Sequence, residues 1–530
     1  MYRSTTRKKP LDRTTFPAST SAPTAGLNSR DPLQSMQQQY AINLTNFLST
    51  PQGVSVREGY RDYATGIEGY VNTLMPYNAV PPASDKLFAA AGTRIYNATQ
   101  IGPASESITG LLSSQWSHIN FTGTAGHYLI ACNGVDAPRH WNGSNWVTWT
   151  YNASPTTPGQ IGGISDPVRF ESVISHQKRL WFVEKNSTVA WYLPINSIGG
   201  AAISFDFGAL FPRGGTLTAL TSWSMNGGTG MQNYLVAISS SGDTVIYDGT
   251  DPSDSTKWAL KGTWRLGAPV GNRCFLAFGG DTLLLSQDGL MPLSKYMQQT
   301  TNEAALTDSI RPTLATLTNT QRGLPGFQIH DYLARNLLIL NVPQINPDSN
   351  IQFIYNTITG GWSLFTGWPA QCWATLGDSV YFGNRGSVSV GFVGYKDAAE
   401  TDGQGGNTYT ATAQQAFSYF EKPGIKKRFV RAKVNLLSAS GRPNVRLACR
   451  VDWATDAPQN VGSATAADAA TWGSSIFGAS EWSGAGLVNS NDWQTLGPIG
   501  YAGSLVIAVS VLSETVWLST EWELEPGGSH

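Results

Sequence analysis

The sequence is poor in charge and in cysteine. Asp, Glu, Lys and Arg make up 13% of its residues, against about 25% in typical soluble domains, and the formal net charge is −1. So small a net charge provides no long-range attraction for nucleic acid or an anionic membrane. The four cysteines are widely separated and form no C-x-x-C pair, which excludes a zinc ribbon or a dithiol redox motif. We expect them to be reduced core thiols of a protein that folds in a cytoplasm.

Signatures of the common catalytic sites are absent as well. No H-E-x-x-H, G-x-S-x-G or Walker-type loop occurs, so we expect neither a metal nor another cofactor. The six histidines are scattered: His118, His127, His140, His176, His330 and His530. A glycosidase needs two facing carboxylates, and the available candidates are Asp136, Asp166, Glu171, Asp206 and Asp243. Acidic residues at turns usually serve the turn itself, so the prediction is a protein that is not an enzyme.

Residues 1–35 are polar and dominated by Thr, Ser, Pro and Arg. Five bases precede position 14: Arg3, Arg7, Lys8, Lys9 and Arg13. No apolar stretch follows them, so the pattern is not that of a signal peptide, and the sequence has no run of 18 apolar residues to span a membrane. We expect a flexible N-terminal arm, which is either solvated or ordered on a neighbouring subunit.

What the sequence has in abundance is the β-hairpin. Two runs of β-forming residues, 234–238 and 244–247, flank a short turn in which Gly242 can adopt a positive φ. The pattern recurs, and the first apolar residues of its copies are Leu87, Tyr128, Leu180, Tyr234, Leu283, Leu337 and Val380. These positions are 41 to 54 residues apart. Because about 40–50 residues form one four-stranded blade, the repeat predicts an all-β protein with a six- or seven-bladed β-propeller over residues 36–395. A sandwich or a solenoid with similar hairpins is the alternative.

Two segments stand apart from the repeat. Within residues 301–320, four apolar residues share one helical face: Leu306, Ile310, Leu314 and Leu317. Pro312 should bend or interrupt this helix, which we expect to cover one face of the propeller. Residues 396–407 are rich in glycine and polar residues, which indicates a linker between domains.

Five more strands are expected beyond the linker, at residues 408–419, 428–437, 444–452, 504–512 and 516–524. They predict a smaller C-terminal β domain, residues 408–530, built as an antiparallel sheet or sandwich. Residues 461–486 are rich in Ala, Ser and Gly and include Trp472 and Trp482. This segment is either a loop that docks on another subunit or an ordered surface loop.

The densest group of bases lies at the second of these strands: Lys422, Lys426, Lys427, Arg428, Arg431 and Lys433. Alternation within residues 429–434 places several of them on one strand face. Two interpretations stay open, because the bases either protect an edge strand from aggregation or contact an acidic neighbour or DNA phosphates. Since each neutralised phosphate adds affinity, a near-neutral chain with a few bases would hold DNA less tightly than a strongly basic one.

Several segments, taken in order, resemble one protein family. The first are "GLNSRDPL" from Gly26, "A-x-x-L-x-N-F" from Ala41 and "P-x-G-V-x-V-R-x-G-Y" from Pro51. The propeller region adds "LFAAAGTRIYNAT", "SHQKRLWFVEKNSTVAWY", "YLVAISSSGDTVIYDGTDPSDSTKW" and "DTLLLSQDGLMPLS". The last are "AQQAFSYFEKPGIKKRFVRAKV" and the terminal "W-L-S-T-E-W-E-L-E-P-G-G". Together these segments resemble the nozzle, or tail-hub, propeller of short-tailed bacteriophages.

This resemblance implies a structural protein of the virion tail that is assembled in the host cytoplasm. It implies a six-bladed propeller in a hexameric ring below the portal and adaptor proteins, which retains packaged DNA and permits its ejection. Tail fibre or tail-tip proteins and transient, non-specific contact with genomic double-stranded DNA would complete the partners. We expect residues 408–527 to bind neighbouring tail proteins and a strand from residues 53–77 to close the propeller. A carbohydrate-binding or glycoside-hydrolysing propeller is the alternative function.

Overall fold

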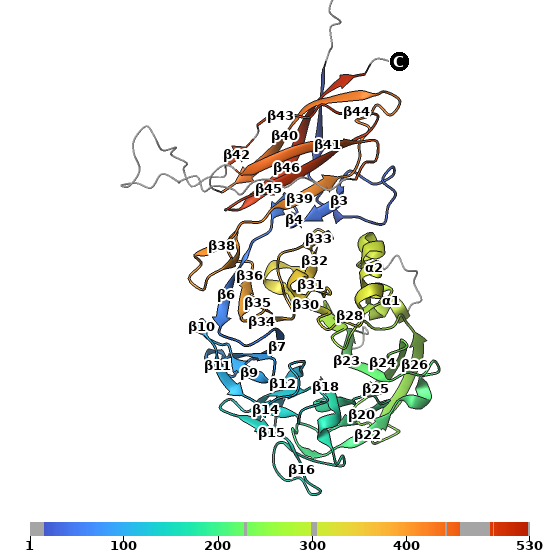
Figure 1. Cartoon of the computed structure of the whole chain (residues 1–530). Helices are drawn as coiled ribbons and strands as arrows, with labels where there is room; N and C mark the ends of the chain where they lie inside the picture. The colour runs from blue at the N-terminus through green and yellow to red at the C-terminus, as the bar shows by residue number, and fades with distance from the viewer. Residues whose placement is uncertain are drawn as a thin grey trace, which may run out of the picture. The chain divides into compact units, whose positions relative to one another are not determined.

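The computed structural model describes residues 15–226, 231–297, 305–439, 443–455, 488–490 and 492–527 (Figure 1). The chain forms two compact units. Unit 1 consists of Met1–Arg57, Ile358–Ser363 and Thr408–His530, and unit 2 of Glu58–Thr357 and Leu364–Asn407. Strands account for 52% of the structure and helices for 7%, which confirms the predicted all-β class.

Unit 2 is a β-propeller in which five four-stranded blades are found. The first is built from β7 (Val71–Tyr77), β8 (Lys86–Ala91), β9 (Arg94–Asn97) and β11 (Ser105–Ile108). The second contains β12 (Ser117–Gly123), β13 (Gly126–Cys132), β14 (Arg139–Trp141) and β15 (Trp146–Thr148). The third contains β18 (Phe170–His176), β19 (Arg179–Glu184), β20 (Val189–Tyr192) and β22 (Ile203–Asp206). The fourth contains β23 (Leu217–Asn226), β24 (Met231–Ser239), β25 (Asp243–Gly249) and β26 (Trp258–Arg265).

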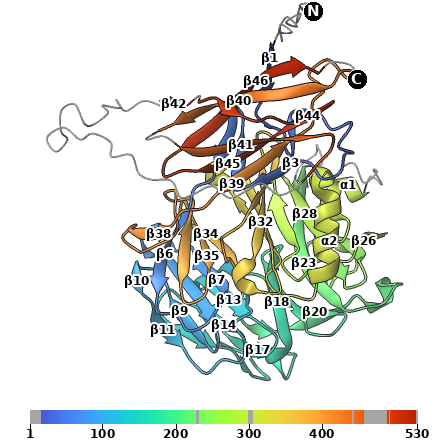
Figure 2. The same ribbon diagram turned by 45° about the horizontal axis from the view of Figure 1, so that its top comes forward.

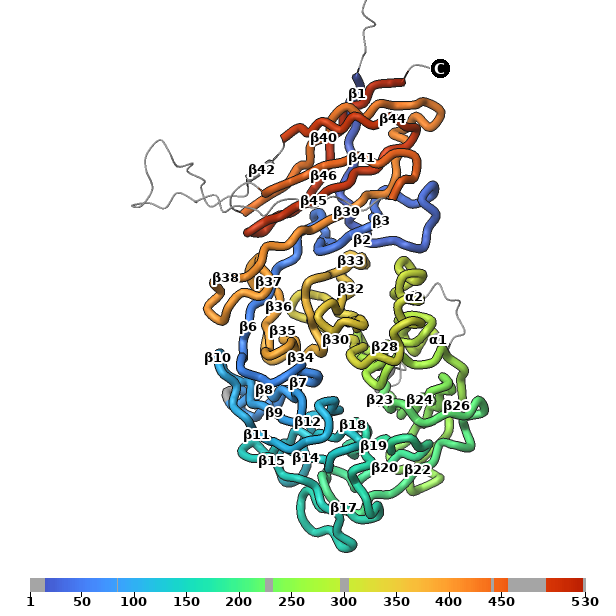
Figure 3. The backbone as a smooth tube through the Cα atoms, viewed as in Figure 1, coloured from blue at the N-terminus to red at the C-terminus, as the bar shows by residue number. Residues whose placement is uncertain are grey.

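The fifth blade closes the propeller. It joins β34 (Trp373–Leu376), β35 (Ser379–Gly383) and β36 (Val388–Gly391) to β6 (Tyr60–Thr65). β6 pairs antiparallel with β36 through contacts such as Tyr60 with Gly391 and Ala64 with Val388. A strand from residues 53–77 therefore completes the last blade, as predicted. In Figure 3 the tube runs around a common centre through unit 2 until its orange part lies beside its blue beginning.

The blade count of six or seven is wrong. The hairpin near Leu283 belongs to a three-stranded sheet of β27 (Phe275–Phe278), β28 (Asp281–Ser286) and β29 (Gly289–Pro292). The hairpin near Leu337 belongs to a meander of β30 (Gln328–Tyr332), β31 (Leu337–Val342) and β32 (Ile351–Asn356). A hairpin motif reveals only two strands of a sheet. Outer strands such as β11 are mostly exposed and carry no apolar alternation, so the sequence did not show which hairpins belong to full blades.

The hairpin predicted around Gly242 shows how neighbouring blades pack. β24 and β25 pair antiparallel, with Leu235 opposite Tyr247 and Ile238 opposite Thr244, and Gly242 adopts a φ of +84° in the turn. Leu235 and Ala237 are fully buried and share a hydrophobic cluster with Trp181 of the preceding blade. One blade therefore depends on the next for the burial of its faces.

Residues 396–407 form part of unit 2 and are not a free linker. β37 (Asp397–Ala399) and β38 (Gly405–Asn407) make a hairpin, and Ala399 pairs with Arg61 of β6. The glycines that suggested a linker serve the turn of this hairpin, where three adopt a positive φ: Gly403, Gly405 and Gly406. Further short strands of unit 2 pair in parallel, namely β10 (Gly102–Pro103) with β6, and β17 (Gln160–Gly162) with both β16 (Thr150–Tyr151) and β21 (Gly200–Ala201).

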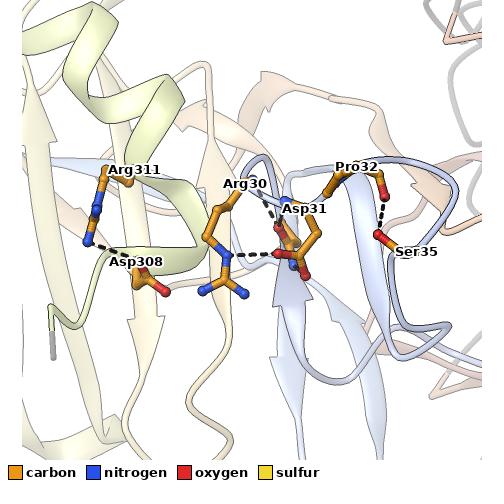
Figure 4. Close-up of polar contacts among 7 residues, drawn as sticks. Arg30, Asp31, Pro32, Ser35, Asp308 and Arg311 are labelled. Atoms are coloured by element: carbon orange, nitrogen blue, oxygen red, sulfur yellow. Dashed lines mark hydrogen bonds and ion pairs between the residues drawn. The ribbon is translucent and has the colours of Figure 1, made fainter. Parts of the chain in front are cut away.

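Two helices, both in unit 2, are described: α1 (Leu293–Met297) and α2 (Arg311–Gln321) (Figure 2). The predicted helix is thus present but begins at Arg311. Pro312 lies in its first turn, where the missing N–H costs nothing, so it starts the helix instead of bending it. Asp308 precedes the helix and its carboxylate pairs with Arg311 at 3.1 Å (Figure 4). Ile310 and Leu314 are buried as expected.

Unit 1 contains two sheets. The first has the order β4 (Phe47–Thr50), β5 (Gly53–Val56), β46 (Thr515–Pro526), β40 (Lys427–Ser438) and β42 (Val488–Ser490). β1 (Phe16–Ser21) also pairs with β46, and β43 (Gln494–Thr495) and β44 (Ile499–Gly500) also pair with β40. The second sheet contains β2 (Gly26–Leu27), β3 (Tyr40–Thr45), β39 (Ala411–Gln415), β45 (Gly503–Ser510) and β41 (Asn444–Val451). β33 (Trp362–Phe365) begins in unit 1, where Trp362 pairs with Gly26.

The sheets of unit 1 contact each other through both polar and aromatic side chains. Thr20 of β1 donates to Gln415 of β39, and Gln494 of β43 donates to the Val445 carbonyl of β41 at 2.8 Å. Trp522 of β46 is fully buried against the rings of Phe420 and Phe429. The five strands expected beyond residue 407 are all present, as β39, β40, β41, β45 and β46.

The boundaries drawn from the sequence differ from those of the structure. Residues 40–56, assigned to the propeller, supply β3, β4 and β5 to unit 1, because β3 pairs with β39 and β5 with β46. The predicted arm is partly ordered, since β1 lies along β46 with Phe16 opposite Leu524 and Ser21 opposite Ser519. Residues 461–486, with Trp472 and Trp482, lie outside the described residues, as do the bases Arg3, Arg7, Lys8, Lys9 and Arg13.

All four cysteines are buried and free, as predicted. Burial raises the pKa of the thiols of Cys274 and Cys449 to about 12 and that of Cys372 to about 11. Such thiols are inert at physiological pH. Within the described residues, neither helix has the length and apolar character needed to cross a bilayer.

Candidate functional site

The basic residues singled out in the sequence lie on β40 and on the loop that leads into it. β40 is twelve residues long and runs antiparallel to β46. The register places three bases directly opposite three acids, Arg428 with Glu525, Arg431 with Glu523 and Lys433 with Glu521. Opposite charges on neighbouring strands attract at this separation. We call these six residues the ion-pair ladder.

The contacts of the ion-pair ladder are direct. Lys433 Nζ lies 2.9 Å from Glu521 Oε2, Arg428 Nη1 lies 3.7 Å from Glu525 Oε2, and Arg431 Nε donates to Glu523 Oε2. The hydrogen bond from Lys433 lowers the pKa of Glu521, and that from Arg431 lowers the pKa of Glu523. Three positive charges thus face three negative ones, so this surface is charge-balanced and is not the basic strip that β40 alone suggested.

Trp493 extends the ladder and was not singled out in the sequence. Its ring lies 4.6 Å from Arg431 Cζ and 5.3 Å from Lys433 Nζ, and 40% of the residue is exposed. Cations at this distance from an indole are attracted to its face. An exposed tryptophan beside arginine is a combination that recurs in protein interfaces. No sequence signal distinguished Trp493 from the other tryptophans, because it precedes a strand, β43, that is only two residues long.

Lys427 does not reach the surface, which corrects its assignment as an interface or DNA-facing residue. It is fully buried, and its Nζ donates to the carbonyls of Lys422, Ile425 and Tyr501 at 2.6, 2.9 and 2.8 Å. Burial lowers the pKa of Lys427, and the neighbouring Lys422 lowers it further. Its ammonium therefore fastens the loop before β40 to the segment before β45.

Lys422 and Lys426 remain as exposed bases outside the ladder. Lys422 Nζ lies 3.7 Å above the ring of Phe16, and Lys426 Nζ lies 5.4 Å from the ring of Tyr501. Neither forms an ion pair with a residue that the structure describes. Of the six candidate residues, these two carry exposed charge that no acid in the described part of unit 1 neutralises.

The motif "GLNSRDPL" forms a polar loop after β2 (Figure 4). Asn28 Oδ1 accepts from the backbone N–H groups of Arg30 and Asp31 at 3.0 Å each, and Asn28 Nδ2 donates to Asp31 at 2.9 Å. Arg30 Nε donates to Asp31 Oδ1 at 2.8 Å, and this bond holds the pKa of the Asp31 carboxyl below its usual value. Asn and Asp in such turns organise the backbone, so this motif shapes a loop.

The motif that ends in "V-R-x-G-Y" is also used for structure. In unit 1 Arg57 is buried, donates from Nε to Asn46 Oδ1 at 2.9 Å, and lies 3.8 Å from the ring of Tyr409. In unit 2 Tyr60 packs edge-on against the rings of Trp368 and Phe382. The motif residues therefore hold backbone segments in place.

The carboxylates considered for glycoside hydrolysis mostly organise turns. Asp136 accepts from the backbone of Leu112 and Ser113, and Asp166, Asp206 and Asp243 each accept from a backbone N–H. Glu171 differs, because burial raises its pKa while Lys185 opposes the rise. A pocket of about 270 Å³ lies among residues 123–128, 155–158 and 195–200, and its lining contains no charged side chain. It provides no acid–base pair.

The histidines, like these carboxylates, mostly have structural roles. Burial lowers the pKa of His118 to about 3 and the pKa values of His140, His176 and His330 to about 4. His140 Nδ1 accepts from Trp149 Nε1 at 2.9 Å, which is the role of a packed neutral imidazole. Across the part of the chain that the structure describes, no group of three His, Cys, Asp or Glu side chains could hold a metal ion.

No protein-family model and no curated protein matches the sequence. Among solved structures, a β-propeller domain of Cps50 (Swd1) from Myceliophteria thermophila is 10% identical and covers 63% of this chain and 99% of its own, with a TM-score of 0.37. YCF48 bound to D1 peptide is 9% identical and covers 68% of this chain and 99% of its own, with a TM-score of 0.32. Similarity this slight carries no argument about function.

Proposed function

We propose that the protein is a structural subunit of the tail of a short-tailed bacteriophage. It forms the nozzle, a ring-shaped DNA conduit below the portal and adaptor that retains packaged DNA and permits its ejection. Its partners are further copies of itself, the portal and adaptor proteins, and tail fibre or tail-tip proteins. Contact with genomic double-stranded DNA is transient and non-specific.

The observation that carries this proposal is the ordered series of motifs that starts at Gly26 and ends at Gly528. The contacts of these motifs support a structural role. Asn28 and Asp31 shape a loop, Arg57 is buried, and Tyr60 packs in the last blade. Residues that shape a loop or pack in the interior contribute to a stable scaffold, and none of these contacts involves a substrate.

The charge balance of unit 1 supports passage of DNA without tight binding. Each phosphate that a base neutralises increases the affinity for DNA. In the ion-pair ladder, three bases are already paired with acids of the same unit. The exposed Lys422 and Lys426 leave two charges for a neighbouring protein or for brief contact with phosphate.

The assembly state tests the proposal. Native mass spectrometry and electron microscopy of the purified full-length chain are expected to show a ring of six subunits. A chain that stays monomeric at every concentration, and also in the presence of its portal and adaptor proteins, would contradict the nozzle.

A surface variant tests the partner contacts. Lys422→Glu together with Lys426→Glu should lower the yield of assembled tails while the melting temperature of the free subunit stays unchanged, because exposed charges contribute little to stability but like charges at an interface repel. Lys178→Glu, at an exposed lysine of unit 2, is the control and should assemble normally. Normal assembly of the double variant would show that these lysines face only solvent.

Carbohydrate binding remains the second candidate because of the pocket beside Tyr128. Its uncharged lining, which includes Thr124, Thr156 and Asn196, suits a neutral sugar better than a phosphate or an acid. Isothermal titration with neutral oligosaccharides separates the two candidates, since a saturable heat that Tyr128→Ala abolishes would favour the sugar-binding protein.

A further inference from the structure

Arg273 joins parts of unit 2 that are far apart in the chain. It precedes β27, and its Nη2 donates to Thr73 Oγ1 at 2.8 Å and to the carbonyl of Trp116 at 3.3 Å. Nη1 and Nη2 also donate to the carbonyl of Asn72 at 3.4 and 3.3 Å. The side chain therefore reaches from the start of one sheet to β7 of the first blade and to the residue before β12 of the second.

These segments surround the axis of the propeller. The first strands of its sheets lie beside one another, since β12 contacts β18, β18 contacts β23, β27 contacts β30, and β34 contacts β7. The sheets of a propeller are arranged around a central channel. A side chain that spans from the start of β27 to β7 and β12 therefore lies at this channel.

The positive charge of Arg273 has no counter-ion among the described residues. All its acceptors are neutral, namely two carbonyls and one hydroxyl. Burial lowers the pKa of Arg273, and the group that opposes this is the thiol of Cys372, which is itself neutral because burial raises its pKa to about 11. A half-buried charge without an opposite charge beside it is costly for a folded protein, and an anion would remove that cost.

His118 offers a second donor two residues after Trp116, whose carbonyl accepts from Arg273. It lies on β12, and burial, strengthened by the charge of Arg273, lowers its pKa to about 3. The imidazole is therefore neutral at physiological pH and carries one N–H. Neither this group nor Arg273 Nε donates to any residue that the structure describes, and both residues keep part of their surface accessible.

We propose that the axial channel of unit 2 binds a small carboxylate anion between Arg273 and His118. One guanidinium matches one negative charge, and the two carboxylate oxygens match the two free donors, Arg273 Nε–H and the imidazole N–H. A phosphate dianion would bring a second negative charge toward the carbonyls of Asn72 and Trp116. The ligand would link three sheets at their centre and stabilise unit 2.

Thermal unfolding of the full-length chain in sodium acetate tests this site against sodium chloride at equal ionic strength. A ligand that binds only the folded state raises the melting temperature in a saturable way, and we expect a rise of about 3 °C with acetate. Arg273→Gln keeps a donor for the carbonyls but lacks the charge, and should lose the rise. Arg139→Gln is the matched control at another half-buried arginine of unit 2 and should keep it.

A second variant covers the case in which Arg273→Gln does not fold. His118→Phe removes only the imidazole donor, and calorimetric titration with acetate should show at least about fivefold weaker binding, the loss of one hydrogen bond. An equal acetate response in Arg273→Gln, an equal response to chloride, no response in the unmodified protein, or unchanged affinity in His118→Phe would each overturn the proposal.

Discussion

The two units of this protein are assembled from the chain in opposite ways. In unit 2, four of the five blades are built from strands that follow one another closely in sequence, and only β6 comes from a distance. In unit 1, β46 pairs with β40, β5 and β1, which come from both ends of the chain. Contacts between distant residues cost more chain entropy before they form. Unit 1 therefore depends on the whole chain, whereas each blade depends mainly on its neighbours.

The units also treat charge differently. Unit 1 lines up three partly exposed ion pairs in a row across β40 and β46. Unit 2 holds four histidines whose low pKa values keep them neutral. The stability of unit 1 should thus respond to salt, and that of unit 2 to acid.

The largest expected effect comes from a tryptophan in the core of unit 1. Trp522 is buried against Phe420 and Phe429, and its Nε1 donates to Thr20 of β1 at 3.1 Å. Trp522→Ala should destabilise unit 1 by about 3–5 kcal/mol. Hydrogen exchange measured by mass spectrometry should show lost protection in β1, β40 and β46 together, although they come from distant parts of the chain.

Trp181→Ala is the matched change in unit 2, where Trp181 is fully buried beside Tyr192 and Trp258. Its loss of protection should be confined to the third and fourth blades. Loss of protection in β1 and β46 from Trp181→Ala would break the comparison, because the two units would then unfold as one.

The hairpins of unit 2 could be predicted from the sequence, whereas the strand pairing of unit 1 could not, and the reason is physical. All seven hairpin positions lie in strands of unit 2, because buried strands carry apolar residues on both faces and glycine at the turn, as around Gly242. The strands that pair with β40 could not be predicted in the same way. Arg431 of β40 and Glu523 of β46 are 92 residues apart in sequence, and the register of such distant strands depends on packing. One signal was present: Glu521, Glu523 and Glu525 alternate with apolar residues just as Arg431 and Lys433 do. Two alternating segments of opposite charge predict a strand pair, and this would have located the ion-pair ladder.

The second prediction concerns the closure of the propeller. A Cβ at Gly59 would lie 1.8 Å from the carbonyl oxygen of Lys396, beside the backbone bond from Tyr60 N–H to that oxygen at 3.1 Å. Gly59→Ala should therefore cost about 3 kcal/mol by forcing these segments apart, measured by urea unfolding. Gly323→Ala, where a Cβ meets no atom within 4 Å, is the control and should be nearly neutral. Equal midpoints for the two variants would show that β6 does not need this close approach.

The third prediction separates the units by acid. A histidine whose pKa falls from 6.5 in the unfolded chain to about 4 in the folded one, such as His140 or His176, binds its proton mainly on unfolding. Its stabilising contribution is full above pH 6.5 and is lost as the pH falls toward 4. At about 1.4 kcal/mol per pKa unit, a fall from 6.5 to about 4 corresponds to about 3.5 kcal/mol for each histidine, most of which is lost by pH 4.5. Hydrogen exchange corrected for intrinsic rates should show unit 2 weakening between pH 6.5 and 4.5, while unit 1 keeps its protection. His140→Asn should flatten this pH dependence.

The smallest effect is expected at the ion-pair ladder, and it tests whether the ladder contributes to stability or to binding. Lys433 and Glu521 keep 18% and 41% of their side-chain surface exposed, so a double-mutant cycle with Lys433→Met and Glu521→Gln should give a coupling of at most about 1 kcal/mol. That coupling should shrink as salt rises, because exposed charges are screened over a Debye length of about 8 Å at physiological ionic strength. In unit 2, Asp243 is buried and accepts from Arg213 Nε at 2.8 Å, so the same cycle on Arg213 and Asp243 should give a larger coupling that salt changes less. Equal couplings would remove the distinction between the units. The expected result would instead show that the partly exposed ladder beside Trp493 contributes little to the stability of unit 1, in contrast to the buried pair of unit 2.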